Sequence, residues 1–141
     1  MSSASRLHRM VTASFASIAF ATIGSQALAA DLRLSGDNEV PPVITMASGS
    51  GPINVAADGS VGGSVKTTGI AATAAHIHLG APGKNGPVIV TLTRTGEGQW
   101  AVPPGAKLDD EQMASYRAGN LYVNVHSDAN KGGEIRAQLK P

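Results

Sequence analysis

The sequence predicts an all-β fold, a Greek-key β-sandwich or barrel of about seven to eight short strands with one short helix. Three observations point to this class. Segments in which apolar and polar residues alternate recur along the chain, and clusters of Gly, Pro, Asn and Asp separate them. A single stretch carries both the start and the stop signals of a helix.

The expected strands follow the alternation in chain order. They are residues 32–34, 53–57, 60–67, 73–79, 87–93, 121–126 and 134–139. Asp58-Gly59, between two alternating segments, is the strongest short-range signal of a hairpin. We expect residues 48–52, rich in Ser and Gly, to be a flexible joint and residues 100–108 to be irregular.

The predicted helix spans residues 110–118. Asp109 is placed to be its N-cap, and Gln112, three residues later, completes a capping box. Gly119 follows the last helical residue, where a left-handed conformation commonly ends a helix.

The apolar positions of the alternating segments predict the core, which is mostly aliphatic because both Phe residues lie in the N-terminal segment. The expected core residues are Ile77, Leu79, Val88, Val90, Leu121, Val123, Val125, Ile135 and Leu139.

Residues 1–29 have the pattern of a secretory signal peptide. Arg6 and Arg9 precede an apolar segment, and Ala27-Leu-Ala29 fits the small-x-small cleavage rule. We therefore expect a periplasmic or secreted domain of residues 30–141, with no membrane association after cleavage. Nine basic residues then face ten acidic ones, so nothing in the charge suggests a nucleic-acid partner. The sequence names no protein partner.

Three histidines share a pattern that suggests a metal site. His76 and His78 are two residues apart on a predicted strand, so both point to the same face. His126 lies on the polar face of another predicted strand, whose other face is aliphatic. If the two strands are neighbours, three imidazoles meet on the outer face of the sheet and present nitrogen ligands that suit copper or zinc. Histidines on a strand face can also be merely solvated or hydrogen-bonded.

Three further residues are weaker candidates. Glu39 lies in a Pro-flanked loop and could be a fourth ligand, an acceptor that fixes an imidazole tautomer, or half of a salt bridge. Arg136 could attract an anion to the site or pair with a carboxylate, and Asp128 could support either role.

Four segments resemble the chordin-type (CHRD) domain, in that family's order. They are Leu34-Ser-Gly-Asp-Asn-Glu-Val-Pro-Pro42, Ala75-His-Ile-His-Leu-Gly80 with Asn85-Gly-Pro87, Gly119-Asn-Leu-Tyr-Val-Asn-Val-His126, and Gly132-Gly-Glu-Ile-Arg-Ala-Gln-Leu139. The resemblance implies one CHRD domain over residues 30–141 and an extracytoplasmic location. The family's animal domains occur in chordin, an extracellular antagonist of morphogen signalling, and its small bacterial members are exported.

The order of the histidines also resembles that of Cu/Zn superoxide dismutase. That resemblance implies that His76, His78 and His126 bind copper and that Arg136 guides superoxide. The chain lacks the family's bridging histidine, its zinc-loop ligands and its disulfide cysteines. These departures weaken the case for dismutase activity more than the case for copper binding.

Three functions therefore remain open on the sequence. The first is a non-enzymatic exported β-sandwich that binds one copper or zinc ion through His76, His78 and His126. The second is a copper enzyme of the superoxide-dismutase type. The third is a metal-free extracellular interaction module.

Overall fold

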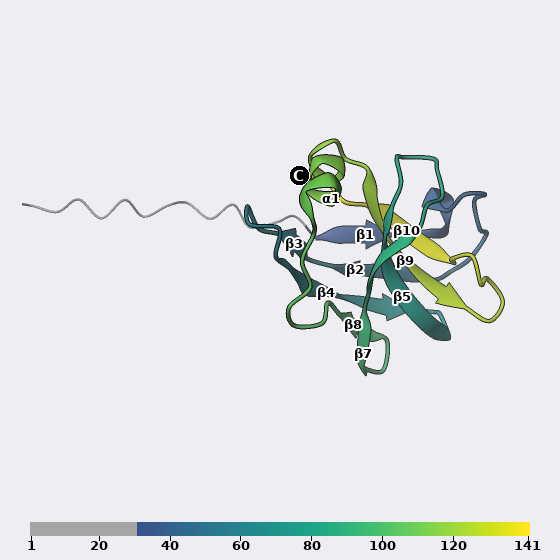
Figure 1. Cartoon of the computed structure of the whole chain (residues 1–141). Helices are drawn as coiled ribbons and strands as arrows, with labels where there is room; N and C mark the ends of the chain where they lie inside the picture. The colour runs from purple at the N-terminus through teal and green to yellow at the C-terminus, as the bar shows by residue number, and fades with distance from the viewer. Residues whose placement is uncertain (1–30) are drawn as a thin grey trace, which may run out of the picture.

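The protein is a sandwich of two antiparallel sheets, seen here in a computed structural model that describes residues 31–141 (Figure 1). The predicted signal peptide lies outside these residues. The elements are β1 (Leu32–Leu34), a 3₁₀ turn (Gly36–Asn38), β2 (Ser48–Gly51), β3 (Ile53–Val55), β4 (Val61–Thr68), β5 (Ala72–Leu79), β6 (Val88–Thr91), β7 (Thr93–Gly96), β8 (Gln99–Ala101), α1 (Asp110–Arg117), β9 (Leu121–Ser127) and β10 (Ile135–Gln138). The predicted all-β class with one short helix is confirmed.

The larger sheet has the order β1-β2-β4-β8-β7, with β3 also paired to β4. β2 and β3 follow one another along the same side of β4, interrupted only at Pro52. The predicted Asp58-Gly59 hairpin is present between β3 and β4. Gly59 has a φ of +87°, and the Asp58 carboxylate accepts a hydrogen bond from the Ser60 N–H at 2.9 Å.

The smaller sheet has the order β10-β9-β5-β6 and carries the histidines. β5 and β9 pair along almost their whole length, which is the adjacency that a three-histidine site requires. In this register Ala74 lies opposite His126, His76 opposite Asn124, and His78 opposite Tyr122.

The two sheets approach each other at both edges. On one side Ser35, just after β1, bridges to Arg136 of β10 through two backbone hydrogen bonds of 3.2 and 3.0 Å. On the other side β6 runs into β7 through Leu92, whose N–H donates to the carbonyl of Ala75 at 2.9 Å. The sandwich is therefore close to a closed barrel.

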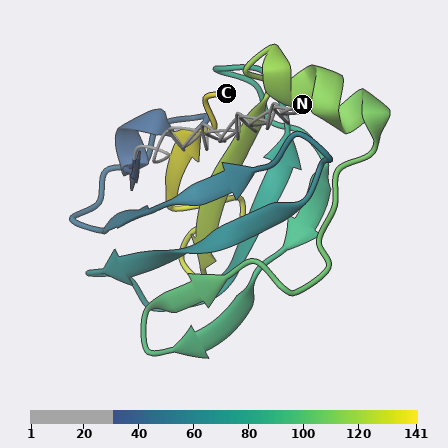
Figure 2. The same cartoon turned by 90° about the vertical axis from the view of Figure 1, so that its left-hand side faces the viewer.

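The helix has the predicted caps. The Asp109 carboxylate accepts from the Gln112 N–H at 2.8 Å, and the Gln112 side chain accepts from the Asp109 N–H at 3.1 Å. Gly119 then takes a φ of +77°. The helix lies across one end of the sandwich (Figure 2). Among residues 31–141 there is no helix of the length and apolarity needed to cross a bilayer.

Most of the predicted core is buried between the sheets, but the prediction that Val88 belongs to the core is wrong. Ile77, Leu121 and Ile135 are fully buried, whereas Val88 is 47 % exposed. A bulge causes the difference, since β6 carries one extra residue between the partners of Ile77 and His78. Val88 therefore pairs with His78 on the outer side of the sheet. Leu79, also predicted as core, is only partly buried.

Three short strands escaped the sequence prediction. β2 lies in the segment expected to be a flexible joint, and β8 lies partly in the segment expected to be irregular. β7 has the sequence Thr-Arg-Thr-Gly and lacks apolar alternation. These strands form because distant strands supply their hydrogen-bonding partners: β2 and β8 pair with β4, and β7 pairs with β8. The local sequence pattern does not show this pairing.

Candidate metal centre

The outer face of the smaller sheet is buried along β9 and most of β10, contrary to the expectation that it faces solvent, and is exposed toward the edge strand β6. All seven residues of β9 are buried, including the polar ones. Two loops, residues 35–45 and 80–87, are bonded to this sheet and to each other. The Asn85 amide donates to the Val40 carbonyl at 2.8 Å, and the Thr45 hydroxyl donates to the Glu134 carboxylate at 2.7 Å. The sheet thus has an aliphatic core on one face and a buried polar layer on the other.

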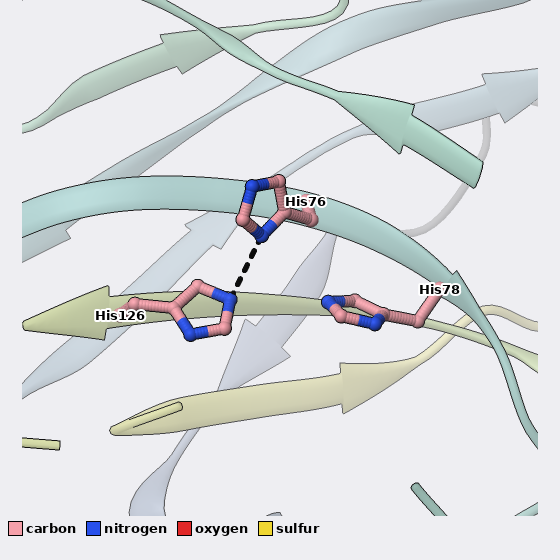
Figure 3. Close-up of side chains that lie close together, drawn as sticks. All are labelled: His76, His78 and His126. Atoms are coloured by element: carbon pink, nitrogen blue, oxygen red, sulfur yellow. Dashed lines mark hydrogen bonds between the residues drawn. The ribbon is translucent and has the colours of Figure 1, made fainter. Parts of the chain in front are cut away.

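The three predicted histidines come together in this polar layer (Figure 3). One ring nitrogen from each lies within 4.8 Å of the others. The ring centroids are 4.7 Å apart for His76 and His126, 5.5 Å for His76 and His78, and 5.9 Å for His78 and His126. His78 and His126 are buried, and His76 is partly exposed. The cluster therefore has two inner residues and one at its opening.

Backbone carbonyls fix the tautomers of the two inner histidines. His78 Nδ1 lies 2.9 Å from the Gly86 carbonyl, and His126 Nδ1 lies 2.8 Å from the Lys131 carbonyl. A carbonyl can only accept, so each Nδ1 carries the hydrogen and each Nε2 keeps a lone pair. His76 Nδ1 lies 2.9 Å from His126 Nε2 and must donate this hydrogen bond. Both Nε2 lone pairs therefore face the middle of the cluster.

His78 Nε2 is a buried acceptor that stays unpaired. Within residues 31–141 no hydrogen-bond donor reaches it. Burial lowers the pKa of His78 and of His76, and in His76 the neighbouring His126 and His78 add to the effect. Both shifts favour neutral imidazole, the form that binds metals.

A glycine makes the contact with His78 possible. A Cβ on Gly86 would come within 1.7 Å of the Leu79 carbonyl oxygen, so only glycine fits this approach of the loop to β5. The Gly86 N–H also donates to the Tyr122 hydroxyl at 3.1 Å. The loop is therefore fixed where its carbonyl meets His78.

A stack of three side chains supports the inner edge of the cluster. The His78 ring stacks on Tyr122 with centroids 4.8 Å apart, and the Arg136 guanidinium lies 3.3 Å from the centroid of the Tyr122 ring. Arg136 also donates to Asn85 Oδ1 at 2.9 Å and to the Lys84 carbonyl. Arg136 is only 2 % exposed and donates to these two acceptors, and its expected role as an anion guide stays a prediction. Arg136 positions Tyr122 and the 80–87 loop.

Glu39 does not join the histidines and does not fix their tautomers, which the two carbonyls do. It lies behind Asn124, where its Oε1 is close to the backbone of Gly133. Burial raises the pKa of Glu39 to about 7, against the opposing effects of Arg136 and Asn124. Asp128 is exposed in the turn after β9 and also lies outside the histidine cluster.

Sequence reasoning missed two residues of the site, Tyr122 and Asn124. Both alternate with His126 on β9, so the signal that placed His126 on this face placed them there too. Together the residues offer three imidazole nitrogens on a rigid pair of strands, a donor set that fits copper or zinc.

Comparison with known proteins gives the family of the chain. No curated protein and no solved structure matches it. The family model of the CHRD domain matches residues 31–139, nearly all of the described part of the chain. The chain therefore belongs to the CHRD family.

Proposed function

We propose that this CHRD domain is an exported, non-enzymatic module that binds one copper ion, or alternatively zinc, through His76 Nδ1, His78 Nε2 and His126 Nε2. CHRD domains are domains of the extracellular type, which supports the exported location. Such a site would let the domain buffer or carry metal outside the cytoplasm.

The main support for the proposal is the tautomers of His78 and His126. Two imidazoles donate their Nδ1 hydrogens to backbone carbonyls, which is the usual support of a histidine that binds a metal through Nε2. The third ring lies 2.9 Å from one of the two lone pairs. Binding of an ion requires that the His76 hydrogen move from Nδ1 to Nε2, and the position of His76 at the opening of the cluster makes this exchange accessible to solvent.

A metal titration tests the proposal. Residues 30–141 without a His tag are titrated with Cu²⁺ and Zn²⁺ against a competing chelator. We expect one ion per chain and a loss of affinity of about 100-fold or more in His76→Ala. His76 is the best choice, because the buried His126 also bonds Lys131 and its removal would disturb the fold. Thr91→Ala, opposite His76 on β6, is the matched control and should bind like the wild type.

Two results would contradict the proposal. One is a wild-type chain that binds neither ion, which leaves the metal-free interaction module. The other is a His76→Ala chain that binds as tightly as the wild type, which places the ion elsewhere.

The affinity should also depend on pH with a defined sign. Protons compete with the ion for the imidazoles, so affinity falls as pH drops. The pKa values of His76 and His78 are lowered, so the loss should begin below about pH 6.5, the range of an unperturbed histidine. Repeating the titration between pH 8 and 5 measures this, and a loss already complete near pH 7 would contradict the lowered pKa values.

A further inference from the structure

Asn124 occupies the centre of the surface from which the three histidines project. It lies directly opposite His76 on the neighbouring strand and two residues from His126 on its own strand. Its other neighbour on β9, Tyr122, lies opposite His78. Side chains at opposite positions of antiparallel strands have Cβ atoms about 4.5–5.5 Å apart, and diagonal ones about 7–8 Å. Asn124 therefore lies within reach of all three imidazoles, beneath the cluster.

Hydrogen bonding on the far side fixes the orientation of the Asn124 amide. Its Nδ2 donates to the Gly132 carbonyl at 3.3 Å. Glu39 lies on the same side, since a Cβ on Gly133 would be 2.4 Å from Asn124 Nδ2 and 2.5 Å from Glu39 Oε1. With the amide nitrogen held there, Oδ1 is left on the side of the histidines, where the Asn124 side chain acts to raise the pKa of His78 against the effect of burial.

Acceptors outnumber donors at this point. Asn124 is 2 % exposed, and its Oδ1 has no hydrogen-bond partner among the residues that the structure describes. The same holds for His78 Nε2, and His126 Nε2 is a third acceptor. In the part of the chain described, only His126 Nε2 of these three acceptors has a donor, which is His76 Nδ1 at 2.9 Å. A buried group of lone pairs with so few donors favours a cation.

We propose that Asn124 Oδ1 is the fourth ligand of the histidine site, which makes a donor set of three nitrogens and one oxygen. The inference rests on the proposed metal binding and adds a preference to it. An amide oxygen is a hard donor, so it stabilises Cu²⁺ and Zn²⁺ and contributes little to soft Cu⁺. Asn124 therefore makes the site selective for divalent ions.

The test compares oxidation states in matched variants. Cu²⁺, Zn²⁺ and Cu⁺ affinities are measured for the wild type and for Asn124→Leu, which keeps the size of the side chain and removes its oxygen. We expect Cu²⁺ and Zn²⁺ affinities to fall about 10–100-fold while Cu⁺ affinity stays unchanged. Gln138→Leu is the control, because Gln138 is an amide on β10 that bonds the Gly80 and Gly119 carbonyls instead. It should leave the ratio of the Cu²⁺ and Cu⁺ affinities unchanged.

A measurement on the wild type covers the case in which Asn124→Leu does not fold. Zn²⁺ is diamagnetic, so the side-chain carbonyl carbons of labelled protein can be followed by NMR during a zinc titration. Coordination should shift the Asn124 Cγ signal in step with the histidine signals, whereas the Gln138 Cδ signal should not move.

The outcomes separate this inference from the proposed function. A wild-type chain that binds no metal overturns both. A wild-type chain that binds metal, with an Asn124→Leu variant of equal Cu²⁺ affinity or an unmoved Asn124 Cγ signal, overturns the role of Asn124 alone. Equal losses of Cu²⁺ and Cu⁺ affinity in Asn124→Leu would show that Asn124 only supports the fold of the cluster.

Discussion

Along the central strand β9 the two faces of the smaller sheet are both buried, yet they are built from opposite chemistry. β9 shows this most directly, because Leu121, Val123 and Val125 point to the inner face and Tyr122, Asn124 and His126 to the outer one. The inner face packs by non-directional apolar contact. The outer face is held by hydrogen bonds, ring stacking and one buried guanidinium, and each of these fixes a direction.

The difference explains why the candidate site lies on the outer face. Apolar packing tolerates exchange among side chains of similar size, whereas a polar layer must supply a partner for nearly every group that it buries. The outer face meets this demand at Arg136, Glu134 and both inner imidazole Nδ1 atoms. Within the residues described, it leaves His78 Nε2, Asn124 Oδ1 and Glu39 Oε1 unpaired, and the first two of these lie where the histidines converge.

The largest expected loss of stability comes from a substitution on the inner face. Leu121→Ala should lower the free energy of unfolding by about 2–5 kcal/mol, because Leu121 is fully buried and its truncation leaves a cavity. Urea unfolding measures the change. Val88→Ala, on the exposed side of the bulge, is the matched aliphatic control and should cost less than about 0.5 kcal/mol. Similar costs for the two variants would contradict the assignment of faces.

A smaller loss of stability is expected from a substitution on the outer face. Arg136→Met should cost about 1–3 kcal/mol, since the variant keeps the apolar stem but leaves the Asn85 and Lys84 acceptors without their donor. It should also weaken metal binding, because the 80–87 loop that holds His78 loses its anchor. Arg33→Met on β1 exchanges an exposed arginine and should change neither stability nor affinity. An Arg136→Met chain as stable as the wild type would mean that the stack on Tyr122 is incidental.

The smallest effect concerns the pH dependence of the outer face. The pKa of Glu39 is raised to about 7 in the folded chain from an ordinary value of 4.5, so the folded state holds more protons than the unfolded state between these values. This carboxyl therefore lowers stability as pH rises from about 4.5 to about 7. Glu39→Gln removes this titrating carboxyl and with it the loss of stability.

Relative to the wild type, Glu39→Gln should gain about 1–2 kcal/mol over that range. The histidine contributions cancel because both chains contain them, and thermal unfolding at several pH values gives the difference. A difference in the free energy of unfolding between the two chains that does not change with pH would show that Glu39 titrates normally.

Much of the fold could be predicted because its signals are local. Alternation located β5 and β9, Asp58-Gly59 located the hairpin, and Asp109 with Gln112 located the helix. β2, β7 and β8 could not be found in this way, because they consist largely of residues without apolar alternation and exist through pairing with distant strands. The bulge that exposes Val88 is likewise a property of the strand pair.

The site was predictable in its residues and not in its environment. Alternation placed His76, His78 and His126 on one face, and the pairing of β5 with β9 brought them together. Nothing local showed that loops 35–45 and 80–87 fold over this face, so the expected roles of Arg136 were to attract an anion or to pair with a carboxylate. Asn124 was overlooked because an amide acquires meaning only from the orphaned oxygen that burial creates.

An anomalous diffraction map of the metal-loaded domain is the most direct test of metal binding at the three histidines. Crystals of residues 30–141 grown with Zn²⁺ or Cu²⁺ are measured at the absorption edge of the ion. We expect one peak about 2.0–2.1 Å from His76 Nδ1, His78 Nε2 and His126 Nε2, within the polar layer. A map with no peak at the three histidines, while the ion binds at another place on the chain, would contradict this expectation.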